Sequence, residues 1–154
     1  MKRLSQQRVH IPLFVRAPGL KPSIETSLIE GSIDLMPSLI KLAELDIPDS
    51  VEGSPWPFLN TSQKSSVLSE SLFEKKYNVS IRTQDWVWHY GCSLNPSNRK
   101  IQEGQDETME LYPRNGGFEK EVGNCASSQN QQISAFKTKF KHHLEMGNHP
   151  PFFI

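Results

Sequence analysis

The chain has 154 residues, and its 17 Lys and Arg residues balance its 17 Asp and Glu residues, so the formal net charge is zero. This length predicts one domain or one piece of a larger domain, and the neutral balance argues against a dedicated binder of nucleic acid or of anionic membranes. Leu, Ile, Val and Phe make up about a quarter of the residues, which suffices for a small hydrophobic core. The sequence has neither an apolar run long enough to span a membrane nor a secretory signal, and the spacing of Cys92 and Cys125 fits no disulfide framework, so we expect a cytoplasmic protein.

The first predicted element is a strand. Residues 10–16 form a nearly continuous apolar run, which Ala17-Pro18-Gly19 closes. Such a run is typical of a strand that is buried on both faces. Pro12 donates no hydrogen bond to a ladder, so it must lie at the start of this strand or on a sheet edge.

The second predicted element is a helix over residues 34–45. Its apolar residues recur three and four positions apart, namely Leu35, Leu39 and Leu42 together with Met36, Ile40 and Ala43. This pattern predicts an apolar stripe that faces the core. Pro37 fits only the first turn, so Asp34 is the expected N-cap acceptor.

The rest of the chain predicts short strands and a terminal helix. Four segments have the alternation or the aromatic and β-branched content of strands: 66–70, 79–82, 86–90 and 109–112. Thr83-Gln84-Asp85 predicts a turn between the second and the third of them. The polar ranges 91–108 and 113–131 predict loops. Apolar residues at helical spacing predict a final helix over 133–146.

Five stretches, taken in order, resemble the C-terminal portion of the sulfatase family, within the alkaline-phosphatase-like superfamily. Residues 10–19 resemble the family's strand and turn VPLIVRAPG, and residues 32–43 resemble its helix VDLMPTLLELAGI. Val51-Glu52-Gly53-Ser54 stands where the family has GxSL, residues 80–86 resemble SVRTDRWKY, and Glu110-Leu111-Tyr112 resembles the start of ELYDL.

The resemblance implies an α+β fold with two parts. Residues 1–58 would be the end of a sulfatase-like α/β core, with the strand at 10–16 and the helix at 34–45. Residues 59–154 would form a small antiparallel sheet of about four strands, with the helix at 133–146 packed on it. In a complete enzyme, the loops at 91–108 and 113–131 are candidates to face the substrate cleft.

The resemblance also implies what the chain lacks. Sulfatases hydrolyse sulfate esters with a formylglycine made from a CxPSR motif, and acidic pairs hold a divalent cation, usually calcium, that neutralises the ester's oxygens. The acidic pairs and the CxPSR motif are absent from this sequence. We therefore expect the C-terminal fragment of a sulfuric ester hydrolase, inactive alone and without a cofactor of its own. Its expected partner is the missing catalytic half or a second copy, with no nucleic acid or membrane partner, and sulfate esters would be substrates only of the complete enzyme.

Two alternatives stay open at this point. The chain can be a non-catalytic interaction module derived from a sulfatase tail, or the tail of a related phosphoester hydrolase. For the fragment we expect marginal stability or self-association, because a strand at 10–16 without neighbours is an aggregation-prone edge. The interaction module would instead need a stable fold and a specific partner.

Few residues are candidates for a site. A sulfatase Lys that contacts sulfate precedes the Pro of the first strand, and the corresponding position is Met1, next to Lys2; a solvated terminal lysine is the simpler interpretation of Lys2. Residues 92–99 resemble CxPSR only superficially, because the Cys-to-Pro spacing is too long and Asn98 separates Ser from Arg. We therefore predict no catalytic, cofactor or metal residue with the exception of Lys2 as a sulfate-binding candidate.

Overall fold

The computed structural model describes residues 4–60, 63–73, 75–95, 106–115, 118–119 and 124–146. These residues belong to two compact units. We call residues 10–67 the helix unit, and the residues up to Val9 together with those from Leu68 onward the sheet unit. The division predicted at residue 58 concerns the parent sulfatase domain and stays a prediction.

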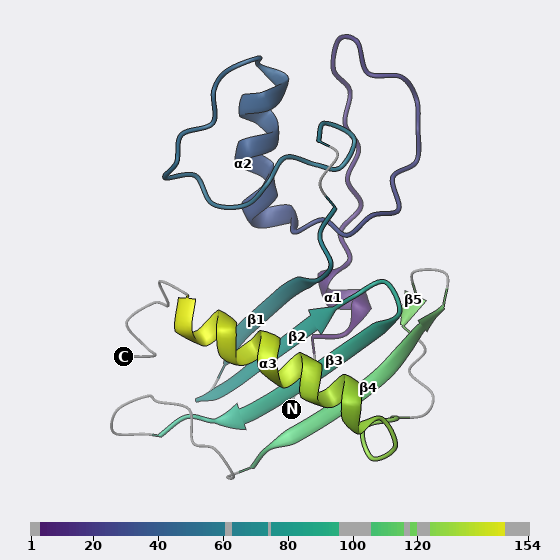
Figure 1. The fold of residues 1–154 in the computed structure, drawn as a ribbon, viewed down its shortest axis with the longest axis vertical. Helices are drawn as coiled ribbons and strands as arrows, with labels where there is room; N and C mark the ends of the chain where they lie inside the picture. Colours follow the sequence, from purple (N-terminus) through teal and green to yellow (C-terminus); the bar gives the residue numbers. More distant parts are fainter. Residues whose placement is uncertain are drawn as a thin grey trace. The chain divides into compact units, whose positions relative to one another are not determined.

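The sheet unit is built on a sheet with the strand order β1-β2-β3-β4-β5 (Figure 1). The strands are β1 (Val67–Phe73), β2 (Lys76–Arg82), β3 (Trp86–Ser93), β4 (Thr108–Asn115) and β5 (Phe118–Glu119). The short helix α1 (Gln6–Val9) precedes them in the sequence, and α3 (Asn130–Met146) follows them. The predicted α+β class, with a small antiparallel sheet and a C-terminal helix, is confirmed.

The predicted hairpin between β2 and β3 is confirmed as well. The strands pair antiparallel, with Arg82 opposite Val87. Thr83 closes the turn: its backbone N–H donates to the Trp86 carbonyl at 2.9 Å, and its hydroxyl oxygen accepts the Trp86 N–H at 3.0 Å. The turn thereby fixes the register, and the register decides which side chains lie on each face of the sheet.

The hydrophobic core lies between one face of the sheet and α3, which crosses that face in Figure 1. Trp88 is completely buried at its centre. Its ring centroid lies 5.5 Å from that of Tyr90, 6.1 Å from that of Phe136 and 5.8 Å from that of Phe140. Ile133 joins Phe136 and Phe140 on the buried side of α3, as the spacing of apolar residues predicts.

The predicted loops 91–108 and 113–131 include residues at their ends that belong to strands or to α3 in the structure. β3 continues to Ser93, because Cys92 is buried in the core opposite Tyr77. β4 runs from Thr108 to Asn115, and α3 begins at Asn130. Backbone hydrogen bonds hold a strand whatever the polarity of its side chains, so polar composition alone misplaces these boundaries. Residues 96–105 and 120–123 lie outside the described residues.

The helix unit has one regular element within its described residues from 10 to 66, which is α2 (Gly31–Leu42). The strand predicted at 10–16 is absent. A strand is held by hydrogen bonds to a neighbouring strand, and the described part of the helix unit offers none. The apolar run is instead solvent-exposed, and the Phe14 side chain is 92% accessible.

α2 buries its polar side and exposes its apolar side. Asp34, Pro37 and Ser38 are buried. Ile40 and Leu42 are half-buried. Four large apolar residues of the helix are exposed, namely Ile33, Leu35, Met36 and Leu39. The prediction that the apolar stripe faces the core is therefore wrong for this unit. The reason is that the chain after the helix presents polar donors, which Asp34 and Ser38 accept.

α2 also begins and ends three residues before the predicted bounds of 34–45. Asp34 lies in the first turn, where its carboxylate accepts the backbone N–H of Glu30, the N-cap residue, at 2.9 Å. This contact satisfies the N–H of the N-cap residue from within the first turn, so Asp34 caps the helix from inside it and is not itself the N-cap residue.

The C-terminus of α2 has the hydrogen bonds of a Schellman motif. The Leu45 N–H donates to the Ile40 carbonyl, and the Glu44 N–H donates to the Lys41 carbonyl, each at 3.1 Å. Glu44 has a φ of 58°, a left-handed conformation that favours glycine. In the sulfatase helix VDLMPTLLELAGI, the residue that matches Glu44 is Gly.

We expect Glu44→Gly to stabilise the helix unit by about 0.5–1 kcal/mol, because glycine relieves the left-handed strain at some cost in chain entropy. Amide hydrogen exchange in α2 measures the change. The matched control is Lys41→Gly in the last helical turn, where φ is helical and glycine should destabilise by up to about 1 kcal/mol. A destabilising Glu44→Gly would contradict the assignment of strain to Glu44.

Candidate functional site

The face of the sheet opposite α3 carries polar side chains that are buried. They alternate with the core residues along β2 and β3, namely Asn78, Ser80, Arg82 and His89. Thr108 and Glu110 of β4 lie on the same face by register. A buried polar face is unusual, because each polar group must find a partner or lose stability.

The register arranges these residues in two rows across the strands. Ser80 lies opposite His89, and His89 lies opposite Glu110. In the neighbouring row Asn78 lies opposite Gly91, and Gly91 lies opposite Thr108. Gly91 has no side chain, so this second row has a side chain only at Asn78 and at Thr108.

Arg82 ties the N-terminal segment to this face. Its guanidinium donates to the Ser80 hydroxyl at 2.7 Å and to the Leu4 carbonyl at 2.5 Å. Ser80 and Arg82 belong to the stretch that resembles SVRTDRWKY. The structure thus gives both residues a role in positioning the chain, and that role needs the two donor directions that an arginine fork provides.

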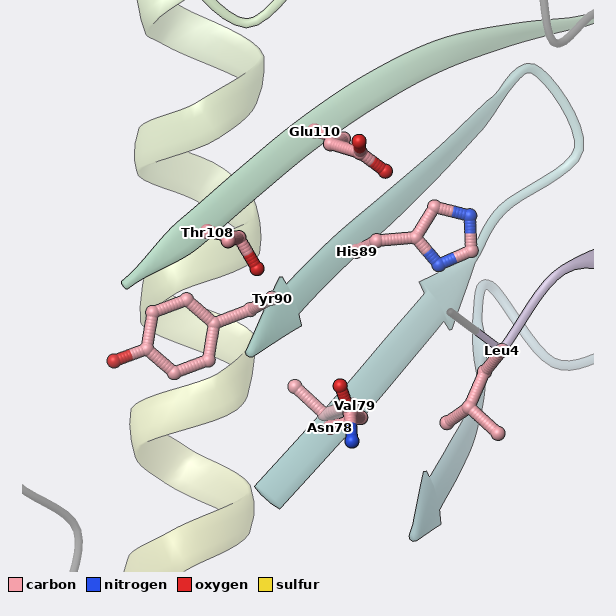
Figure 2. A pocket seen from close by; sticks show the side chains of 7 residues that line it. All are labelled: Leu4, Asn78, Val79, His89, Tyr90, Thr108 and Glu110. Carbon is pink, nitrogen blue, oxygen red and sulfur yellow. The ribbon is translucent and has the colours of Figure 1, made fainter. Parts of the chain in front are cut away.

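A pocket of about 280 Å³ opens on this face (Figure 2). We call it the sheet-face pocket. Its lining residues are Leu4, Asn78, Val79, His89, Tyr90, Thr108 and Glu110. All of them lie in the sheet unit, so the pocket is formed within one compact body.

The row of Ser80, His89 and Glu110 has the residue types of a hydrolytic triad, but not the accessibility of one. Ser80 has no exposed surface, and its oxygen already accepts a hydrogen bond from Arg82. A nucleophile must reach the substrate and be activated by its base. We therefore assign Ser80 to the support of the sheet face.

The helix unit contains a second polar cluster, centred on Asp34, which is 2% exposed. Its carboxylate accepts the Ser54 N–H at 3.0 Å and the Lys64 ammonium at 2.8 Å. The buried Ser38 hydroxyl accepts the Trp56 N–H at 2.9 Å. These bonds join α2 to the chain around Gly53-Ser54, so two of the stretches that resemble sulfatases contact each other directly.

Lys64 makes this cluster sensitive to pH. Burial lowers the pKa of Lys64, but its hydrogen bonds and charge interactions with Asp34 and Glu30 outweigh burial and raise the pKa above its ordinary value of 10.5. A pKa that is raised on folding contributes stability at lower pH, and this stability is lost as the pH rises through the folded-state pKa.

We therefore expect the helix unit to lose stability above about pH 10.5, and Lys64→Met to remove much of this dependence. The carbon-bound indole signals of Trp56 report unfolding of this unit in urea at each pH. Lys41→Met, at an exposed lysine of α2, is the control and should keep the dependence. An identical pH dependence in Lys64→Met and the unsubstituted chain would refute the assignment.

The structure brings few of the sequence candidates together. Lys2 lies outside the described residues. Cys92 and Ser93 belong to β3 and not to a polar loop, and residues 96–99 lie outside the described residues. No group of three His, Cys, Asp or Glu side chains that could hold a metal ion occurs within the described residues. Among the same residues, no helix is long and apolar enough to cross a membrane.

Sequence analysis did not identify the polar sheet face. The signal was present as a strict alternation in β2, where Asn78 and Ser80 stand between Tyr77, Val79 and Ile81. Such a pattern predicts a strand with one solvated face. Only the structure shows that this face is buried and that a pocket opens on it.

Comparison with known proteins gives similarity to sulfatases. No protein-family model matches the chain. Arylsulfatase K of Homo sapiens is 25% identical over 96 residues, which are 60% of this chain and 16% of the human protein. Arylsulfatase K of Xenopus laevis is 32% identical over 59 residues, which are 38% of this chain and 11% of the frog protein. Sulfatase ppz1 of Metarhizium majus (strain ARSEF 297) is 24% identical over 85 residues, which are 55% of this chain and 19% of that protein.

The chain therefore spans less than a fifth of the length of these curated relatives. The resemblance predicted from the sequence motifs is confirmed at low identity. This chain is similar to sulfatases over up to about 60% of its length, as is consistent with the C-terminal portion of such a protein.

Proposed function

We propose that this chain is the C-terminal segment of a sulfatase-like sulfuric ester hydrolase, inactive alone, that completes a catalytic half bearing the nucleophile and the metal ligands. Arylsulfatase K and sulfatase ppz1 are the relatives that support this class. The formylglycine and the calcium site of a complete enzyme would come from the other half. This chain would support the sheet and shape the substrate cleft.

The observation that carries the proposal is the inverted burial of α2. A helix with an apolar stripe normally buries that stripe, yet the Met36 side chain is 58% exposed while Asp34 is buried. Phe14, in the apolar run 10–16, is even more exposed. Large apolar surfaces of this kind mark interaction sites. The catalytic half is the occupant we propose, because it would offer the strand neighbours that the run 10–16 lacks.

The test is complementation. The purified chain is mixed with a separately produced polypeptide that bears the CxPSR and paired-Asp motifs, and hydrolysis of p-nitrophenyl sulfate is followed. We expect no hydrolysis by the chain alone and chelator-sensitive hydrolysis by the mixture. Hydrolysis by the chain alone that a chelator abolishes would refute the assignment of an inactive segment.

A matched pair of variants locates the interface. Phe14 and Ile24 are each 92% exposed, but only Phe14 lies in the apolar run 10–16. We expect Phe14→Asp to reduce capture of the catalytic half at least about tenfold, and Ile24→Asp to leave it unchanged. Equal effects of both substitutions would contradict docking through this run.

The same experiment separates the alternatives. Stable folding without complementation by any such polypeptide would favour the non-catalytic interaction module. Complementation that cleaves p-nitrophenyl phosphate and not the sulfate would favour the phosphoester hydrolase. Self-association through the same exposed surface would appear as a concentration-dependent oligomer, and Phe14→Asp would shift it to the monomer. The cytoplasmic location remains part of this proposal and rests on the spacing of the two cysteines.

A further inference from the structure

The sheet-face pocket contains a buried acceptor without a partner. Asn78 lines the pocket and is 5% exposed, and its Oδ1 atom has no hydrogen-bond partner among the described residues. A buried acceptor left in this state costs stability, and a ligand that donates a hydrogen bond to it removes that cost. The terminal torsion of an Asn side chain is soft, which lets the amide turn its oxygen toward the pocket.

The charge of the pocket selects the kind of donor. The described lining includes the Glu110 carboxylate, the Thr108 hydroxyl and the imidazole of His89, which lies opposite Glu110 in register, and it includes no Lys or Arg (Figure 2). Arg82 lies on the same face, but it is four residues and about 13 Å along β2 from Asn78, and its guanidinium bonds Ser80 and Leu4. An anionic ligand would be repelled by Glu110, whereas a cation meets acceptors.

The register sets the distance between two of the polar residues that line or border the pocket. Asn78 and Thr108 flank Gly91 in register on the two neighbouring strands. Strands are spaced about 4.8 Å apart, so the backbones that carry these two side chains lie about 10 Å apart. The Tyr90 ring packs against Phe140 in the core at 5.3 Å and offers no stacking surface to a ring-shaped ligand.

We propose that the sheet-face pocket binds the guanidinium group of an arginine side chain presented by the completing polypeptide. A guanidinium carries five donors in a planar fork and no acceptor, so it can donate to an amide oxygen and a carboxylate together. The presenting polypeptide rests on the proposed function of this chain. The preference of the pocket for a guanidinium does not, and it is testable with small probes.

The first experiment measures binding of N-acetyl-arginine methyl ester to the full chain by NMR. We expect the Asn78 side-chain amide signals to shift, with saturation at millimolar concentration. N-acetyl-citrulline methyl ester has nearly the same shape without the charge, and it should bind at least about tenfold more weakly. Equal binding of the two probes, or no shift at Asn78, would overturn the proposal.

Variants test the two contacts. We expect Glu110→Gln to weaken binding of the arginine probe about tenfold, whereas Glu145→Gln, on the exposed side of α3, should leave it unchanged. Asn78→Asp adds negative charge at the acceptor and should strengthen binding, which provides a test even where Glu110→Gln fails to fold. Weaker binding to a folded Asn78→Asp chain would overturn the assignment of a cation.

The second experiment asks which molecule presents the guanidinium. Glu110→Gln should lower capture of the completing polypeptide about tenfold relative to Glu145→Gln. If Glu110→Gln leaves capture unchanged while the unsubstituted chain binds the arginine probe, the pocket takes a free cation. This result would overturn the assignment to a partner side chain. Probe binding without any capture by the unsubstituted chain would refute the proposed function and leave the guanidinium pocket supported.

Discussion

Replacement of Trp88 by alanine is expected to destabilise the sheet unit by about 4 kcal/mol, the largest loss among the substitutions considered for this unit. Trp88 is completely buried and contacts the rings of Tyr90, Phe136 and Phe140. Its removal leaves a cavity between β3 and α3 that these aromatic side chains cannot fill without leaving their own positions. Small domains have a total stability of about 5–15 kcal/mol, so the variant should be close to unfolding.

Urea unfolding followed by far-ultraviolet circular dichroism measures this loss. Trp88→Phe is the matched control and should cost only about 1–2 kcal/mol, because phenylalanine keeps most of the ring contacts. The indole N–H has no acceptor among the described residues, so its loss costs no hydrogen bond. A similar small cost for Trp88→Ala would show that α3 does not pack on β3 in solution.

Replacement of Gly53 by alanine is expected to destabilise the helix unit by about 3 kcal/mol or more. Gly53 has a φ of +87°, and a Cβ at this position would lie 2.3 Å from the Ile33 carbonyl oxygen. That carbonyl is available for a close approach because its helical donor would be residue 37, which is a proline without an N–H. The clash is with backbone, so relief requires a shift of α2 away from Ser54 and the loss of the Ser54 bond to Asp34.

Gly19 provides the control for this prediction. It also has a positive φ, of +78°, but a Cβ there meets nothing within 4 Å. Gly19→Ala should therefore cost only the conformational strain, about 1 kcal/mol. The difference between the two variants isolates the contact with α2. Urea unfolding followed by the Trp56 indole signals measures the free energy of unfolding of both variants. Equal losses of stability in Gly53→Ala and Gly19→Ala would exclude a close approach of Gly53 to α2.

The sequence alone predicted the elements whose signals are local. The turn at Thr83-Gln84-Asp85 and the apolar spacing of Ile133, Phe136 and Phe140 depend on near neighbours, and both gave the correct element. The resemblance to sulfatases likewise rests on short ordered motifs, and the comparisons bear it out. Local geometry limits these features to few alternatives, so a single sequence suffices.

Features that depend on distant partners were not predictable in the same way. The run 10–16 has the composition of a buried strand, but a strand requires a neighbour, and the helix unit has none among its described residues. The stripe of α2 has helical spacing, but which side is buried depends on where the donors of Ser54, Trp56 and Lys64 lie.

By itself, then, the sequence determined the hairpin, the final helix, the α+β class and the likeness to sulfatases. Tertiary structure alone decided that α2 is held by its polar side, that β2 and β3 bury a polar face opposite α3, and that a pocket lined by Asn78 opens on this face. The physical reason is that burial is a property of the surfaces that meet. In the sequence, an exposed apolar stripe has the same pattern as a buried one, and a buried polar face has the same pattern as a solvated one. Only the fold shows what lies against each surface.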